Sequence, residues 1–307
     1  MVALSPIISI GMPVYNGQAF IESAIKSILE QTFEDFELIL SDNASNDKTQ
    51  EICLDYKQQD NRIRYFRNEV NLGAAQNYNH VFELSKGKYF KWAAHDDLCN
   101  STFLFRCVEV LDNDPSVVLC YPKTVLIDVN GNVIENYEDA LALFENRPYQ
   151  RLAKFVRNVR LCNPVFGLLR ASVLSRTRLI DKFVSSDEVL LAELALMGKF
   201  FECSERLFLR RMHSQSSWES NESPQEKARW FDPNSRSQYV MRRNRLFFEI
   251  LKSIKQSKLP FPEQIKCGRV FISEWLRLHW LEMGSENKAA IKKVIRNFYL
   301  QLNHSKV

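Results

Sequence analysis

Two polar stretches stand where early apolar runs of this chain end, and they hold the residues best suited to chemistry. The stretch 41–47 contains Asp42, and the stretch 94–97 contains Asp96 and Asp97. Each follows a run of apolar and β-branched residues, which is typical of a buried strand. Open α/β sheets bind ligands at the carboxyl ends of neighbouring parallel strands. The sequence therefore predicts a carboxylate-rich site at one edge of a sheet.

The chemistry expected of this site also depends on what the sequence lacks. Neither GxGxxG nor GxxxxGK[ST] is found after the first apolar run, so the glycine loops that cradle phosphate in dinucleotide-binding and P-loop enzymes are absent. Carboxylates neutralise phosphate differently, because they hold Mg²⁺ or Mn²⁺ through oxygen while the ion binds diphosphate oxygens. We therefore expect Mg²⁺ or Mn²⁺ as the cofactor.

Alternating strands and helices must position these carboxylates. Apolar runs predict strands, and apolar residues at three- and four-residue spacing predict helices. The predicted strands cover residues 7–10, 36–40, 62–66 and 88–93, and the helices between them cover 20–29, 46–56 and 73–84. This order favours an α/β fold with a Rossmann-like, mostly parallel sheet flanked by helices.

The second half of the chain alternates less regularly. A helix is predicted near 102–111, a strand at 117–121 and a hairpin turn at Asn130-Gly131. Helical spacing returns in the tail, which is predicted to form helices over 239–254, 265–283 and 289–302. We predict a catalytic domain over residues 1–220 and a helical C-terminal appendage over residues 221–307.

Composition limits the classes of protein to which the chain can belong. Its 307 residues are 45% hydrophobic and 25% charged, as in ordinary globular proteins. The seven cysteines form no CxxC pair, so we predict reduced core thiols and a cytoplasmic location. No signal peptide and no apolar stretch of about eighteen residues occurs, so any membrane contact is expected to be peripheral.

The C-terminal region is strongly basic. Residues 236–307 hold 15 Lys and Arg against 5 Asp and Glu, whereas residues 1–235 hold 26 against 32. Such helices can lie peripherally on an anionic membrane, at its inner face, although a solvated basic face is the commoner arrangement. No nucleic-acid-binding motif accompanies the charge, so no nucleic acid partner is expected.

Four motifs in fixed order carry a family resemblance. The segments 12–16, 42–47, 71–73 with Asn77, and 95–97 resemble the signature of family 2 glycosyltransferases of the GT-A fold. The resemblance implies a sugar transfer from a nucleoside diphosphate sugar, UDP- or dTDP-linked, to a hydroxyl of a glycan or lipid-linked acceptor. It also implies inversion at the anomeric carbon and the help of a divalent metal.

The resemblance assigns a nucleotide-sugar site. The residues implied to contact the donor are Pro13, Tyr15, Asn16, Asp42, Asn43, Gly73, Asn77, His95 and Arg211. Asp42 would accept a hydrogen bond from the base, and Gly73 would let the backbone approach the nucleotide closely. From the residues alone, helix capping by Asp42 and a plain turn at Gly73 stay open.

The metal motif of the family is altered in this sequence. Its usual Asp-x-Asp begins at Ala94, so the first acid is missing and the second falls on Asp96. The resemblance therefore implies Asp96 as the leading metal ligand. Asp97 would bind through water or cap the next turn, and His95 would take over part of the ribose contact.

The resemblance also places a general base. Asp187 precedes an apolar helix over 189–197 closed by Gly198, as the catalytic acid of the family does, and Glu188 is the reserve candidate. A carboxylate there would remove the proton of the acceptor hydroxyl. Both acids would in addition complement the dipole of the helix.

A third segment, 207–217, resembles the strand of the family that ends in Arg-x-His. His213 would serve as a further metal ligand or a diphosphate donor, and Arg210 or Arg211 would screen the charge of the leaving group. The polar loop 214–226 would act as a lid over the bound donor.

Two functions of other classes stay open from the sequence. A nucleotidyltransferase uses a similar sheet, but the Gly- and Arg-rich loop of that group is missing from residues 11–15. A non-catalytic nucleotide-sugar- or glycan-binding module would explain the loss of an acid at Ala94, although the retained Asp187 argues against it.

Overall fold

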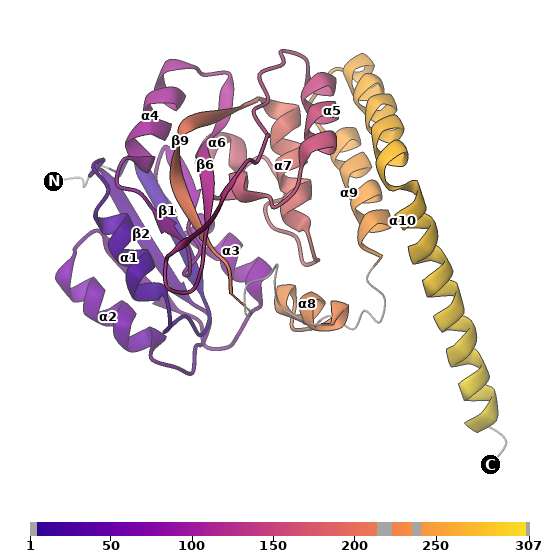
Figure 1. The fold of residues 1–307 in the computed structure, drawn as a ribbon, viewed down its shortest axis with the longest axis horizontal. Coiled ribbons are helices and arrows are strands. Elements are labelled where there is room, and N and C mark those ends of the chain that lie inside the picture. The colour runs from indigo at the N-terminus through magenta and orange to yellow at the C-terminus, as the bar shows by residue number, and fades with distance from the viewer. Residues whose placement is uncertain (1–4, 214–222, 235–240, 305–307) are drawn as a thin grey trace.

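One mixed β-sheet positions the polar stretches, and helices cover both of its faces (Figure 1). The structure, a computed structural model, describes residues 5–213, 223–234 and 241–304. The sheet runs in the order β3 (Ile63–Arg67), β2 (Phe36–Asp42), β1 (Ile8–Val14), β4 (Tyr89–Trp92), β8 (Leu168–Arg170), β6 (Val117–Ile127), β9 (Lys199–Arg211) and β5 (Leu98–Cys99), with β7 (Val133–Tyr137) paired to β6.

Helices connect and cover these strands. They are α1 (Ile21–Leu29), α2 (Thr49–Gln59), α3 (Ala74–Glu83), α4 (Phe103–Asn113), α5 (Pro148–Asn158), α6 (Ala171–Leu174), α7 (Ser186–Met197), α8 (Pro224–Phe231), α9 (Arg242–Gln256) and α10 (Phe261–His304), with a 3-10 helix at Asn163–Phe166. The predicted strands and helices up to β4 are all present, with ends displaced by a few residues.

The parallel half of the sheet brings the predicted site residues together. β1 pairs in parallel with both β2 and β4, and β2 pairs in parallel with β3. In this register Val14 lies opposite Asp42 and Gly11 opposite Trp92. Because all these strands point the same way, the loops after β1, β2 and β4 meet at one edge.

Antiparallel strands complete the other half of the sheet. β8 runs antiparallel to both β4 and β6, whereas β9 lies parallel to β6 over most of its length. The predicted hairpin is present, since β6 and β7 pair antiparallel around Gly131, which has a φ of 88°. β9 therefore ends beside the loop after β4 and delivers Arg211 to the same edge.

Two apolar cores lie on opposite faces of the sheet. One contains the buried faces of α1, α2 and α4, and the other contains α3, α5 and α7. The second core also takes in α9 and the first part of α10, through residues such as Leu246, Ile250 and Phe271. Both helices of the tail thus pack onto α5 and α7 (Figure 1). The proposed boundary near residue 220 stays a prediction and lies outside the described residues.

The tail differs from the sequence prediction in one respect. Two helices were expected over 265–283 and 289–302, but α10 is one continuous helix of 44 residues. The residues between the expected helices, 284–288, include one glycine and no proline. A single glycine costs only about 1 kcal/mol in a helix, so the helix continues through it.

Candidate functional site

A cavity of about 550 Å³ opens where β1, β2 and β4 end. Its size suits a ligand as large as a nucleotide sugar. It brings together ten of the predicted site residues, namely Pro13, Tyr15, Asn16, Asn43, Asn77, His95, Asp96, Asp97, Arg211 and His213. Asp42, Gly73 and Asp187 are not part of its wall. A place in the cavity wall does not show what a residue binds, so the contacts predicted between these residues and the donor or the metal stay predictions.

Three asparagines on the β1–β2 side of the cavity are already hydrogen-bonded to the protein. Asn16 has a φ of 52°, donates its N–H to the Ser45 hydroxyl (2.9 Å), and accepts the N–H of Asn46. The Asn43 amide donates to the Asn71 side chain (2.8 Å). Asn77 Nδ2 donates to the Ser41 carbonyl oxygen (2.9 Å). These bonds fix the loops after β1 and β2 against α3.

Asp42 lies behind this wall and is fully buried at the end of β2. Its carboxylate accepts hydrogen bonds from the Ser45 N–H and the Tyr65 hydroxyl, both at 2.8 Å, and forms an ion pair with Arg67. Asp42 therefore braces the loop after β2. Its contact with a base stays a prediction. Asp42 does not cap α2, whose first N–H, on Thr49, is bound by Asp47 (2.9 Å).

Gly73 meets the end of α8. Its φ is 83°, and a Cβ added there would lie 2.7 Å from the Phe231 carbonyl oxygen and 2.5 Å from Pro233. Both the positive φ and the close approach favour glycine at this position. Whether Gly73 also lets a nucleotide approach stays a prediction.

Asp96 and His213 form one corner of the cavity. Asp96 Oδ2 and His213 Nε2 are 2.9 Å apart, and both side chains are mostly buried. The His213 ring packs on the Phe20 ring, with 5.0 Å between centroids. Burial opposes the charge of Asp96, but His213 and nearby His95 hold the pKa of this carboxyl below its usual value. Asp96 is therefore ionised at neutral pH, with its charge directed toward the imidazole.

Asp97 and Arg211 support this corner from behind. Asp97 accepts the backbone N–H of Arg211 (2.8 Å), and burial together with the Asp96 charge raises the pKa of Asp97 to about 7. The Arg211 guanidinium donates to the carbonyl oxygens of Asp96 (2.9 Å), Asp128 (3.1 Å) and Val129 (3.0 Å). Arg211 thus fixes the loop that carries Asp96, and its contact with the donor stays a prediction.

The predicted base and its reserve occupy different environments in the first turn of α7. Glu188 forms an ion pair with Arg242 of α9, and the same guanidinium donates to the Ser185 hydroxyl (2.6 Å). Within the described residues Asp187 has no such partner, and it accepts the N–H of Glu188 at its Oδ1 (3.1 Å). Burial raises the pKa of Asp187, against weaker opposing effects of the Glu188 N–H and of the Arg242 and Arg210 charges. Of the two acids, Asp187 is the better proton acceptor.

The sequence profile of glycosyl transferase family 2 matches residues 9–177, which is more than half of the chain. The chain belongs to this family. The match includes the cavity wall as far as Asp97 and ends before Asp187 and His213. The expected family is thereby confirmed, and the roles of those two residues are not covered by the match.

Relatives in other organisms agree with the family assignment. An uncharacterized glycosyltransferase of Methanocaldococcus jannaschii is 26% identical over 185 residues, covering 60% of this chain and 62% of the relative. The glycosyltransferase GlyG of Streptococcus pneumoniae is 33% identical over 117 residues, covering 38% of this chain and 39% of the relative. The chain thus spans less than two thirds of the length of each.

Solved structures confirm the expected GT-A type fold. Residues 1–349 of Staphylococcus aureus TarS in complex with UDP-GlcNAc are 17% identical with a TM-score of 0.62, covering 88% of this chain and 72% of that one. The mannosyltransferase PcManGT of Pyrobaculum calidifontis in complex with GDP-Man and Mn²⁺ is 15% identical with a TM-score of 0.54, covering 97% and 81%. At these identities the likeness concerns the fold alone.

Tyr78, which the sequence analysis did not assign, and Arg210, which it gave as an alternative to Arg211, both lie near the metal corner and Asp187. Burial raises the pKa of the Tyr78 phenol, and the charges of Asp96, Asp97 and Asp187 raise it further. Arg210 lowers the pKa of Asp97 and of Asp187, and its guanidinium donates to the Asn163 side chain (2.5 Å). Both Tyr78 and Arg210 line the cavity. Tyr78 and Arg210 are thus each affected by the charges of both acidic groups.

Helix α8 supplies the far wall of the cavity. Arg229 and Trp230 line it, together with Glu226. The helix begins at a capping box, in which Ser223 and Glu226 bind each other's backbone N–H groups. Ser-Pro-x-Glu is a recognisable helix start, so this signal was present in the sequence. The lid predicted over 214–226 lies outside the described residues as far as 222, and its last residues begin α8.

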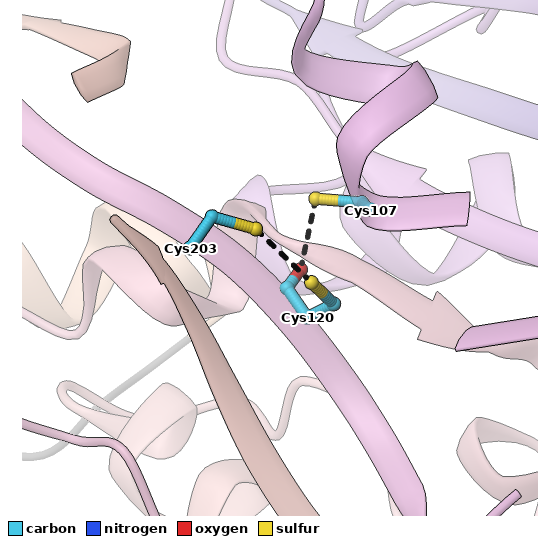
Figure 2. Close-up of side chains that lie close together, drawn as sticks. All are labelled: Cys107, Cys120 and Cys203. Atoms are coloured by element: carbon cyan, nitrogen blue, oxygen red, sulfur yellow. Dashed lines mark hydrogen bonds between the residues drawn. The ribbon is translucent and has the colours of Figure 1, made fainter. Parts of the chain in front are cut away.

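Three cysteines lie together in the core that contains α1, α2 and α4 (Figure 2). Cys120 Sγ and Cys203 Sγ are 3.5 Å apart, and Cys107 Sγ is 3.5 Å from the Cys120 carbonyl oxygen. Burial raises the pKa of the Cys107 thiol well above its usual value, so it stays protonated. All seven cysteines are free and most are buried, which confirms the prediction of unpaired core thiols.

Proposed function

We propose that the enzyme transfers one sugar from a nucleoside diphosphate sugar to a hydroxyl of a glycan or lipid-linked acceptor, by an inverting single displacement. The observation that carries this proposal is that one cavity contains both the asparagine-lined loops and the Asp96–His213 pair. TarS in complex with UDP-GlcNAc and PcManGT in complex with GDP-Man support a nucleotide-sugar donor for the same fold. We propose a UDP- or dTDP-linked sugar.

The residues at the metal corner fit Mg²⁺ or Mn²⁺. Neighbouring ligands of an octahedral ion bound at about 2.1 Å are about 3 Å apart, which agrees with the 2.9 Å between Asp96 Oδ2 and His213 Nε2. Ions of this kind commonly take few protein ligands and fill the rest with water and phosphate oxygens. We propose Asp96 and His213 as the ligands and Asp97 as a water-mediated or supporting group. A bound ion would stabilise the charge of the leaving diphosphate.

Asp187 is proposed as the general base. A base is most effective when its pKa lies near the working pH, and burial moves the pKa of Asp187 in that direction. Burial raises the pKa of Glu188 as well, but its carboxylate is engaged by Arg242, which makes it the poorer candidate. In this arrangement Asp187 accepts the proton of the acceptor hydroxyl.

Cations on the cavity wall are proposed to bind the diphosphate. Arg229 lines the cavity on the α8 side and Arg210 lines it near Asp187. Guanidinium groups suit phosphate because they donate two parallel hydrogen bonds. We propose that Arg229 contacts the donor directly, whereas Arg210 mainly holds the charge balance between Asp97 and Asp187.

The proposal is tested by release of nucleoside diphosphate from a panel of UDP-, dTDP- and GDP-sugars, with and without Mn²⁺. Metal-dependent hydrolysis of one donor by the wild-type enzyme, and its loss in Asp96→Ala, is the expected result. Turnover that is unaffected by chelation and by Asp96→Ala would contradict the metal assignment. Binding of no donor at all would contradict the proposed substrate class.

The stereochemical part of the proposal has its own test. Once a donor and an acceptor are known, the anomeric proton of the product reports its configuration in an NMR spectrum. A β-linked product from an α-linked donor is expected for a single displacement. An α-linked product would contradict inversion.

A further inference from the structure

Helix α10 has two apolar faces on opposite sides, and the body of the protein covers one of them. Cys267, Phe271 and Trp275 follow at four-residue steps and are almost completely buried. They belong to the same core as α5, α7 and α9. This inward face accounts for how the helix attaches. Figure 1 shows the C-terminal part of α10 continuing past the first turn of α9, away from the body.

The outward face is apolar as well. A residue nine positions along a helix is turned by about half a turn, so Trp280 faces away from the core side of Phe271. Trp280 and Ile291 are 62% and 59% exposed. The exposed apolar residues on the outward half of α10, about a quarter turn or more from Phe271, are Phe261, Ile265, Ile272, Leu276, Trp280, Leu281 and Ile291. Together they form an apolar stripe that runs along α10 from its first residue to Ile291.

The acidic residues of α10 are largely committed to neighbours on the protein. Glu274 pairs with Arg157, and Glu282 pairs with Arg243 at 2.7 Å. Glu286 accepts the backbone N–H of Arg243 (2.9 Å). The carboxylates of these three residues are therefore engaged by α5 and α9, two of them in ion pairs and Glu286 in hydrogen bonds.

Some cations of α10 are left without such partners, whereas Lys266 pairs with Glu263 and Arg277 with Glu274 within the helix. In the part of the chain that the structure describes, Arg269, Lys288 and Lys292 are exposed and form no ion pair. The sequence 287–304 contains four Lys and Arg and no Asp or Glu. Positive charge thus accompanies the apolar stripe and becomes denser toward the end of the helix.

We propose that the outward face of α10 binds an anionic lipid bilayer, with the apolar stripe inserted among the headgroups and the cations at the lipid phosphates. An apolar face flanked by Lys and Arg is the pattern of helices that lie in a membrane interface. No helix in the described ranges is apolar enough over a sufficient length to cross a membrane. The helix would therefore lie along the surface.

A second copy of the chain suits this face less well. In a symmetric dimer the same surface meets itself, so the unpaired cations of one α10 would approach those of the other. Like charges brought together across an interface cost free energy. An anionic bilayer supplies the opposite charge instead, and it also accepts the apolar residues.

Sedimentation with vesicles tests this inference on the full-length protein in the absence of any sugar donor. Vesicles of phosphatidylcholine alone are compared with vesicles that also contain phosphatidylglycerol. We expect binding to the anionic vesicles only, and we expect salt to weaken it because exposed charges are screened. Replacing both Leu276 and Trp280 by Ser should weaken binding about tenfold or more, given the apolar burial that is lost.

A matched variant separates this effect from a general loss of surface apolar residues. Phe105→Ser removes a half-exposed aromatic residue on α4, far along the chain from α10, and should leave vesicle binding unchanged. Circular dichroism and thermal unfolding confirm that each variant is folded. Equal sedimentation of wild type and the Leu276/Trp280 variant would overturn the proposal.

A second measurement distinguishes membrane binding by α10 from dimerisation through α10. Light scattering of the free protein gives its mass in solution. A stable dimer that Trp280→Ser converts to a monomer, with no binding to anionic vesicles, would overturn the membrane proposal in favour of a second copy. Because no donor is present, neither result depends on the proposed transfer reaction.

Discussion

The two sides of the cavity differ in how their polar groups are satisfied. On the β1–β2 side, Asn16, Asn43 and Asn77 form hydrogen bonds with neighbouring loops. Asp42 accepts two hydrogen bonds and forms an ion pair with Arg67. Near the end of β4, Asp96 is mostly buried and pairs only with His213 among the described residues, and half-buried Asp187, at the start of α7 and outside the cavity wall, accepts only the Glu188 N–H.

This difference separates residues that hold the loops in place from residues that are available for binding and catalysis. A buried carboxylate with few partners costs folding free energy, so such groups tend to be found where a site needs them for a ligand or a proton. The bonded asparagines hold loops in place, whereas Asp96 and Asp187 are kept available. Substitutions on the first side should therefore change stability, and substitutions on the second side should change activity.

The largest effect is expected for Asp187→Asn. Loss of a general base typically lowers kcat about 10²- to 10⁴-fold. Because burial raises the pKa of Asp187, its charged form opposes folding at neutral pH, so a neutral Asn should leave the unfolding free energy equal or higher. Steady-state kinetics and chemical denaturation measure the two quantities. Glu188→Gln is the control, and a kcat loss there that matches Asp187→Asn would reverse the assignment.

Asp96→Ala should have the next largest effect. Removing a metal-binding carboxylate forfeits several kcal/mol of charge stabilisation, or about 10²-fold or more in kcat/KM. Chelation of wild type should reproduce this loss, and added Mn²⁺ should restore activity to wild type but not to the variant. Activity of Asp96→Ala that Mn²⁺ restores fully would show that Asp96 is not a ligand.

The pH profile gives a smaller and more specific effect. Asp187 must be ionised to accept a proton, so kcat/KM should fall about tenfold per pH unit below its pKa. The ordinary pKa of an Asp side chain is about 3.9. Burial raises the pKa of Asp187, so the fall in kcat/KM should begin at a higher pH than an ordinary Asp would give. Calorimetric measurement of UDP binding over the same pH range shows whether groups at the metal corner change protonation there. Their effect on kcat/KM can then be separated from that of Asp187. A profile that is unchanged in Asp187→Asn would contradict the assignment.

The smallest effect on activity is expected on the scaffold side. Asp42→Asn leaves the partly buried Arg67 without its ion pair and should lower the unfolding free energy by about 1–3 kcal/mol, with little change in donor KM. Asp60→Asn breaks a comparable pair with Arg62 that is more exposed, and should cost less than about 1 kcal/mol. A raised donor KM with unchanged stability of Asp42→Asn would instead support the predicted contact with the base.

The sequence was most informative for the parallel half of the sheet. The first strands are apolar runs separated by helical patterns, so both their type and their order were predictable. β8 and β5 were not predicted, because strands of three and two residues carry no periodicity and form through pairing with β4, β6 and β9. The continuity of α10 was missed because a polar, glycine-containing stretch was interpreted as a break.

The same limit applies to the site. Pro13 lies at the end of β1, and Asn43 and Asp96 follow the neighbouring parallel strands β2 and β4, so their meeting follows from topology. Tyr78, Arg210 and Arg229 belong to segments far apart in sequence, and only the tertiary packing of α3, β9 and α8 brings them to one cavity. The bracing role of Asp42 was likewise hidden, since it depends on Tyr65 and Arg67 of the neighbouring strand.

Calorimetric titration of UDP with and without Mn²⁺, on wild type, Asp96→Ala and Asp187→Asn, separates donor binding from proton transfer. We predict Mn²⁺-dependent binding by wild type and by Asp187→Asn with the same affinity, and loss of the Mn²⁺ effect in Asp96→Ala. Equal, Mn²⁺-dependent binding by all three proteins would contradict the role of Asp96. Loss of binding in Asp187→Asn would contradict its role as the base that acts after the donor is bound.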